Sequence, residues 1–82
     1  MITLQLFARY RELLDTDYEE IPWDSGLSSV GDLRDRLLAR GAAWEVLGEQ
    51  RVMCARNQEM CGLDAPLADG DEIAFFPPVT GG

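Results

Sequence analysis

The sequence contains no histidine, and this absence removes the residue on which many enzymes depend. Histidine is the commonest general base near neutral pH and the commonest protein ligand for metal ions. Without it, neither a Ser-His-Asp nor a Cys-His catalytic arrangement can be assembled. The acidic stretch DGDE at 69–72 does not match a calcium-binding loop, and its glycine predicts a tight turn that enters a strand. We therefore predict neither an independent enzyme nor a bound metal.

Basic residues are also scarce, with seven against fifteen acidic residues, which gives a net charge of −8. Such a surface repels phosphate backbones, so we expect no nucleic-acid partner. The charge either speeds encounter with a protein that has a basic docking surface or serves solubility alone.

Long apolar runs and cysteine motifs are missing as well. No stretch approaches the ~18 consecutive apolar residues of a membrane span, and the opening MITLQLFARY lacks the pattern of a secretory signal. The two cysteines, Cys54 and Cys61, match neither a CxxC redox pair nor a four-ligand zinc pattern. We predict a cytoplasmic protein without membrane association, whose cysteines are free thiols packed in the fold.

What is present indicates one small globular domain of the α+β class. Residues 2–8 alternate in hydropathy and predict a strand whose core face carries Ile2, Leu4, Leu6 and Ala8. A helical turn over 11–15 and a second strand over 16–23 complete a predicted hairpin. Pro22 assigns that second strand to an edge or an end of the sheet.

The clearest helix lies over 28–41, because both of its ends carry a signal. Ser29 followed by Asp32 resembles a capping box, and Gly41 provides a stop. Its apolar stripe predicts one amphipathic helix packed against a sheet, and the stripe consists of Val30, Leu33, Leu37 and Leu38.

The second half of the chain predicts strands. A connecting segment with Trp44, Val46 and Leu47 is expected to cover the end of the core, before strands over 51–57 and 59–62. In the last strand, over 71–76, Ile73 and Phe75 share one face, whereas Ala74 and Phe76 share the other. Pro77 and Pro78 then end sheet pairing, because proline has no backbone N–H to donate.

The residues after this strand predict an extended arm. We place the domain at 1–76 and the arm at 77–82, which at ~3.3 Å per residue reaches about 20 Å. After Pro77 and Pro78 come Val79, Thr80, Gly81 and Gly82. The glycines make a thin tip that could enter a narrow channel and present a carboxylate. Taken alone, a Gly-Gly ending is more often simply a loose end or a remnant of cloning.

Several segments carry a family resemblance that covers essentially the whole chain. They are LFARYREL at 6–13 with TD shortly after, RNQ at 56–58 and PLADGDEIAFFPPVTGG at 66–82. Together they resemble the small subunits of molybdopterin synthase, the sulfur carriers of molybdenum cofactor synthesis. The resemblance implies a β-grasp fold like that of ubiquitin, a roll in which one main helix lies across a mixed sheet. Arg56 departs from the family pattern, since relatives often have an apolar residue there.

The resemblance also implies a mechanism. An ATP-using activating enzyme would adenylate the carboxylate of Gly82, and the acyl-AMP would then become a thiocarboxylate. The large synthase subunit would accept the arm, and the thiocarboxylate would give its sulfur to cyclic pyranopterin monophosphate to build the dithiolene of molybdopterin. The synthase would contain two copies of each subunit. The chain itself would bind no cofactor and would not be an enzyme on its own.

In a β-grasp fold the first and last strands are neighbours, so Phe7 and Phe76 are predicted to emerge together on the face opposite the helix, where Met60 could join them. Exposed apolar residues beside a functional arm predict a docking surface. One surface used by both the activating enzyme and the large subunit would make their binding mutually exclusive. Two alternatives stay open: another Gly-Gly carrier, such as the thiazole sulfur carrier or a ubiquitin-like modifier, and a binding-only β-grasp adaptor.

Overall fold

The computed structural model describes residues 1–78, so four predicted arm residues, Val79, Thr80, Gly81 and Gly82, lie outside the described residues. In chain order the elements are β1 (Ile2–Leu6), α1 (Ala8–Leu14), β2 (Tyr18–Ile21), α2 (Val30–Leu38), the 3-10 helix η1 (Ala42–Gly48), β3 (Met53–Arg56), β4 (Glu59–Cys61) and β5 (Glu72–Phe76).

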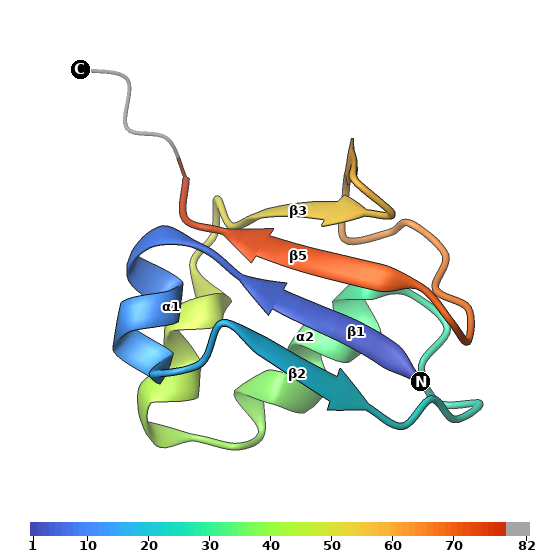
Figure 1. The fold of residues 1–82 in the computed structure, drawn as a ribbon, viewed down its shortest axis with the longest axis horizontal. Coiled ribbons are helices and arrows are strands. Elements are labelled where there is room, and N and C mark those ends of the chain that lie inside the picture. Colours follow the sequence, from blue (N-terminus) through green and yellow to red (C-terminus); the bar gives the residue numbers. More distant parts are fainter. Residues whose placement is uncertain (79–82) are drawn as a thin grey trace.

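The strands form one mixed sheet in the order β2-β1-β5-β3-β4. The central strands β1 and β5 run parallel, and every other neighbouring pair is antiparallel. The helix α2 lies behind the sheet, across one of its faces (Figure 1). This arrangement is the β-grasp fold, as predicted, and it places the first and last strands side by side in the middle of the sheet.

The core lies between the sheet and α2. Ile2, Leu4 and Leu6 of β1 are fully buried, and so are Val30, Leu33 and Leu37 of α2, as the alternation and the stripe predicted. The prediction for Ala8 was wrong, because this residue is exposed and begins α1. The φ angle of Ala8 is 54°, so the chain turns out of the extended conformation and the alternation stops.

The helix α1 is longer than the predicted turn over 11–15. Tyr10 and Leu14, four residues apart, are both buried, so one helical face packs on the core and stabilises the extra residues. The strand β2 that follows is an edge strand paired antiparallel with β1, and Pro22 comes directly after it. The predicted pairing is therefore confirmed, with α1 in the connection.

The predicted capping box of α2 is confirmed. Ser29 Oγ accepts a hydrogen bond from the Asp32 N–H at 3.1 Å, and the Asp32 carboxylate accepts one from the Ser29 N–H at 3.1 Å. The predicted stop at Gly41 was too late, because α2 ends at Leu38. Arg40 and Gly41 instead donate to carbonyls three residues back, and the φ of 75° at Gly41 turns the chain into η1.

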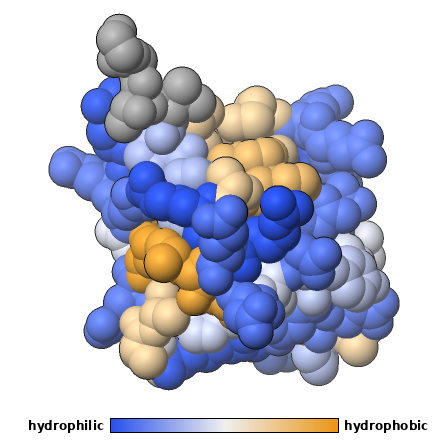
Figure 2. Space-filling view, turned by 60° about the vertical axis from the view of Figure 1, so that its left-hand side comes forward, coloured by the Kyte–Doolittle hydropathy of each residue, from blue (hydrophilic) through white to orange (hydrophobic). Residues whose placement is uncertain are grey.

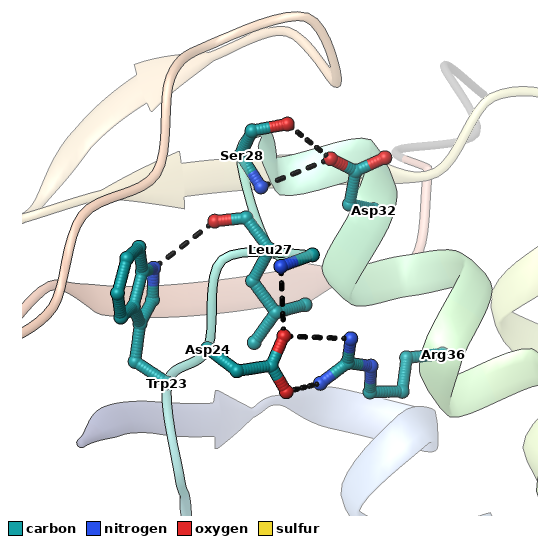
Figure 3. A network of polar contacts seen from close by, with 7 residues as sticks. Trp23, Asp24, Leu27, Ser28, Asp32 and Arg36 are labelled. Atoms are coloured by element: carbon teal, nitrogen blue, oxygen red, sulfur yellow. Dashed lines mark hydrogen bonds and ion pairs between the residues drawn. The ribbon is translucent and has the colours of Figure 1, made fainter.

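A polar network holds the loop before α2 against the helix (Figure 3). Arg36 donates to both carboxylate oxygens of Asp24, at 2.6 and 3.1 Å. Trp23 Nε1 donates to the Leu27 carbonyl at 3.0 Å. These bonds let the fully buried Leu27 enter the core from an irregular segment.

The second half follows the predicted order. Trp44 and Val46 pack against the core from η1, and Leu47 is fully buried. The third strand is shorter than the predicted 51–57, and the short fourth strand is present. The turn before β5 is also confirmed, because the Asp71 N–H donates to the Ala68 carbonyl at 3.1 Å and Gly70 has a φ of 95°.

Candidate docking groove and the base of the arm

A groove of about 240 Å³ crosses the face of the sheet opposite α2. It receives side chains from β1, β3, β4 and β5, and its apolar lining consists of Phe7, Ala55, Met60, Ala74 and Phe76. The structure therefore brings the three predicted docking residues, Phe7, Met60 and Phe76, to one groove. Phe7 is 38% exposed and Met60 is 59% exposed, and Phe76 is half-buried.

Phe7 and Phe76 form a stacked pair across the two central strands. Their ring centroids are 4.9 Å apart and the ring planes differ by 11°. The parallel register pairs Leu6 with Phe75, so the residue after each lies on the opposite face, where the two rings meet. This stack lies at the point where β5 leaves the sheet.

Figure 2 views the molecule with the end that carries α1 turned forward, and hydrophobic residues there gather in separate areas among hydrophilic ones. The exposed large hydrophobic side chains include Phe7 and Met60 of the groove, and also Leu13 of α1 outside it. The polar residues Gln5, Gln58 and Glu72 also line the groove. A surface that combines apolar side chains with polar ones is typical of a protein interface.

The base of the predicted arm starts beside this groove. Phe76, the last residue of β5, is paired with Met53 of β3. Pro77 and Pro78 follow and are both half-buried. The reactive residue predicted from the family resemblance, Gly82, lies outside the described residues, as do Val79, Thr80 and Gly81.

A buried carboxylate next to the groove was missed by the sequence reasoning. Asp71 is only 7% exposed and accepts hydrogen bonds from Arg56 Nε at 2.8 Å, Asn57 Nδ2 at 3.1 Å and the Ala68 N–H at 2.8 Å. Burial alone raises the pKa of Asp71, but the bonds from Arg56, Ala68 and Asn57 outweigh it and lower this pKa. Arg56, the residue that departs from the family pattern, was the signal in the sequence that could have revealed this network.

This network ties the β3–β4 turn to the start of β5. The Asn57 N–H donates to the Glu72 carbonyl at 2.8 Å, and the Glu72 N–H donates to Asn57 Oδ1 at 3.0 Å. Gln58, which lines the groove, follows Asn57 directly, and Met60, which also lines it, is the middle residue of β4 after this turn. The network therefore sets the position of one wall of the groove.

The ThiS family model matches residues 4–82. The chain belongs to the ThiS family. It is 43% identical to the molybdopterin synthase sulfur carrier subunit of Escherichia coli (strain K12), with 100% of both chains covered. It is 36% identical to the protein of that name from Haemophilus influenzae, again over 100% of both.

Solved structures of relatives share the fold. SAMP1 from Haloferax volcanii matches with a TM-score of 0.78 and 34% identity, covering 99% of this chain and 98% of that one. A complex of subunits 1 and 2 of the molybdopterin-converting factor from Helicobacter pylori contains a chain with a TM-score of 0.66 and 27% identity, covering 99% and 97%. These likenesses agree with the ubiquitin-like fold and confirm the family resemblance seen in the sequence.

A second network anchors α1 of this ThiS-family chain. The Glu49 carboxylate, just after η1, accepts hydrogen bonds from the Tyr10 hydroxyl and from Arg9. Burial raises the pKa of Tyr10, and the bond to Glu49 raises it further, so the hydroxyl stays a donor. Because α1 starts directly after Phe7, this anchor also limits where the stacked ring can lie.

Within residues 1–78 of the ThiS-family chain, no three Cys, Asp or Glu side chains are grouped so that they could hold a metal ion. In the same range, no helix has the length and apolar character needed to cross a bilayer.

Proposed function

We propose that this ThiS-family chain is the sulfur carrier subunit of a molybdopterin synthase. The observation that carries the proposal is the full-length similarity to proteins of that name, at 43% and 36% identity over 100% of both chains in each case. The alternative of a modifier is less well supported, since the small archaeal modifier protein 1 of Haloferax volcanii is 35% identical over 95% of this chain.

The proposed chemistry takes place on the carboxylate of Gly82. A carboxylate oxygen attacks the α-phosphate of ATP in the activating enzyme, and pyrophosphate leaves. A hydrosulfide equivalent from the sulfur donor then displaces AMP from the acyl adenylate, and the Gly82 thiocarboxylate results. Adenylation is needed because a carboxylate is a poor electrophile until it has a leaving group. In the synthase, the thiocarboxylate gives its sulfur to cyclic pyranopterin monophosphate.

The composition of the chain indicates which chemical roles belong to the chain and which belong to its partners. It has no histidine to act as a base, so its partners supply the acid, base and nucleotide chemistry. The chain supplies the carboxyl group of Gly82, on which the sulfur is carried. The chain is then not an enzyme alone but a subunit of a cytoplasmic sulfurtransferase complex. The arm of Pro77, Pro78, Val79, Thr80 and Gly81 would carry Gly82 into each partner's active site.

The groove with Phe7, Met60 and Phe76 is the proposed docking surface for the large subunit. Its apolar floor lies beside the base of the arm, so docking there would aim the arm into the partner. The complex of subunits 1 and 2 of the Helicobacter pylori factor supports a subunit partner of this kind. The activating enzyme would use the same groove, and the two complexes would exclude each other.

Intact mass spectrometry tests the carrier function. The chain is incubated with its activating enzyme, ATP and a sulfur donor, and the mass is expected to change by the exchange of one oxygen for sulfur, mapped to Gly82. A variant without Gly81 and Gly82 is the control and should stay unmodified while remaining folded. An unchanged wild-type mass, with an activating enzyme that modifies a known carrier, would favour a binding-only adaptor.

The docking surface has its own test. Phe76→Arg places a charge in the groove and is expected to abolish capture of the large subunit and of the activating enzyme. Leu13→Arg is the matched control, because Leu13 is 54% exposed on α1 and does not line the groove. If Phe76→Arg left both complexes intact, the groove would not be the docking surface.

A further inference from the structure

The two cysteines, 7 residues apart in sequence, are direct neighbours in the β3–β4 hairpin. Cys54 of β3 is paired with Cys61 of β4 in the register of the sheet. Their Sγ atoms are 3.8 Å apart, and the Cys54 thiol donates to the Cys61 carbonyl at 3.2 Å. Both are free thiols on the core side of the sheet. No step of the proposed sulfur transfer uses either one.

The geometry of the hairpin suits a bond between them. The connecting residues Asn57 and Gln58 have φ angles of 52° and 70°, which is typical of a tight two-residue turn. In such a hairpin the flanking pair Arg56 and Glu59 is hydrogen-bonded, and so is the pair two positions further, Cys54 and Cys61. Hydrogen-bonded pairs have Cα atoms about 5.5 Å apart, within the range of disulfides.

The two thiols differ in access. Cys54 is 1% exposed, whereas Cys61 is half-buried and lines an open hollow of about 290 Å³ with Arg56, Asn57 and Glu59. Burial raises the pKa of the Cys54 thiol to about 12. A small disulfide can therefore reach Cys61 first, while Cys54 is positioned behind it.

We propose that Cys54 and Cys61 are a modification site, at which a small-molecule disulfide such as oxidised glutathione forms an intramolecular disulfide across the β3–β4 hairpin. The inference does not rest on the proposed function. The bond would close the hairpin covalently on its core side. It would thereby fix the register of β4, an edge strand whose Met60 lines the docking groove on the other side.

The reaction proceeds by two exchanges. The Cys61 thiolate attacks one sulfur of oxidised glutathione, and a glutathione thiolate leaves, so Cys61 carries a mixed disulfide. The Cys54 sulfur then attacks Cys61 Sγ, and the second glutathione leaves as the thiol, taking up the proton that Cys54 gives up. The two cysteines lose two electrons and two protons in total. One molecule of oxidised glutathione gains these electrons and protons and becomes two glutathione thiols.

The test is an intact-mass time course of the full chain with oxidised glutathione, without reductant. The wild type is expected to lose two hydrogen atoms and both titratable thiols while remaining monomeric, and dithiothreitol should reverse this. Accumulation of two glutathione adducts, or of disulfide-linked dimers, would overturn the proposal.

Single variants test the order of attack. Cys54→Ser should stop at one glutathione on Cys61, and Cys61→Ser should react at least about 10-fold more slowly, because its remaining thiol is buried. Circular dichroism establishes that each variant is folded, and Cys54→Ala replaces Cys54→Ser if the hydroxyl destabilises the core. Equal rates for the two folded single variants would contradict the assignment of Cys61 as the first sulfur to react.

Discussion

Replacing Asp71 with asparagine removes a buried charge while it preserves the shape of the side chain. The carboxylate of Asp71 accepts from three donors, which are Arg56 Nε, Asn57 Nδ2 and the Ala68 N–H. An amide has one acceptor oxygen and one NH₂ group, so at least one of the three donors would face another donor. The turn that leads into β5 would lose part of its anchor.

The size of the destabilisation follows from the hydrogen-bond partners of Asp71. A hydrogen bond to a charged group contributes about 1.5–3 kcal/mol, and its donor is costly to bury unpaired. Arg56 is partly exposed and can be rehydrated, which reduces the cost. We expect Asp71→Asn to lower the free energy of unfolding by about 2–3 kcal/mol, which corresponds to a fall of about 10–20 °C in the thermal midpoint of a domain of this size.

Differential scanning calorimetry at pH 7 measures this effect. Asp69→Asn is the matched control, because it changes the charge equally, two residues earlier, at a side chain that is 62% exposed and pairs with the Met1 amine. An exposed ion pair contributes about 0–1 kcal/mol, so the control should change little. Equal losses for the two variants would refute the role assigned to the Asp71 network.

The effect should depend on pH in a defined direction. The folded pKa of Asp71 lies below its ordinary value of 3.8, so ionised Asp71 stabilises the fold above about pH 4. This stability is lost as the pH falls through the folded pKa. The difference between wild type and Asp71→Asn should therefore be largest near pH 7 and shrink below about pH 4. A difference that stayed constant down to pH 2.5 would contradict an ionised acceptor.

Three further outcomes are expected. A double-mutant cycle of Phe7→Leu and Phe76→Leu in urea unfolding should give a coupling of about 0.5–1.5 kcal/mol from the stacked rings, and additive losses would show that the stack contributes nothing. Ser29→Ala should lower the free energy of unfolding by about 1 kcal/mol, since the Asp32 N–H loses its capping acceptor; an unchanged midpoint would argue against the cap. Leu33→Ala, at a fully buried helix position, should cost about 2–5 kcal/mol in the same assay, and a cost under 1 kcal/mol would mean that the core collapses around the site.

Much of this protein could be predicted from local patterns. The capping box at Ser29 placed the start of α2, alternation placed the buried residues of β1 and β5, and the glycine at 70 placed the turn before β5. These signals act over a few residues, because capping, alternation and turn conformation depend on neighbouring backbone groups. The family resemblance contributed the β-grasp order of the strands and the chemistry proposed for Gly82.

Only the tertiary structure decided which of these residues meet. Asp71 lies 15 residues from Arg56, and nothing local shows that its carboxylate is buried among donors. The parallel register of β1 and β5 brings Phe7 against Phe76, and the short β3–β4 turn sets Cys54 opposite Cys61. A local pattern determines which face of an element a side chain occupies. The partner across that face depends on how the chain crosses the sheet, and this is set by packing of the whole core.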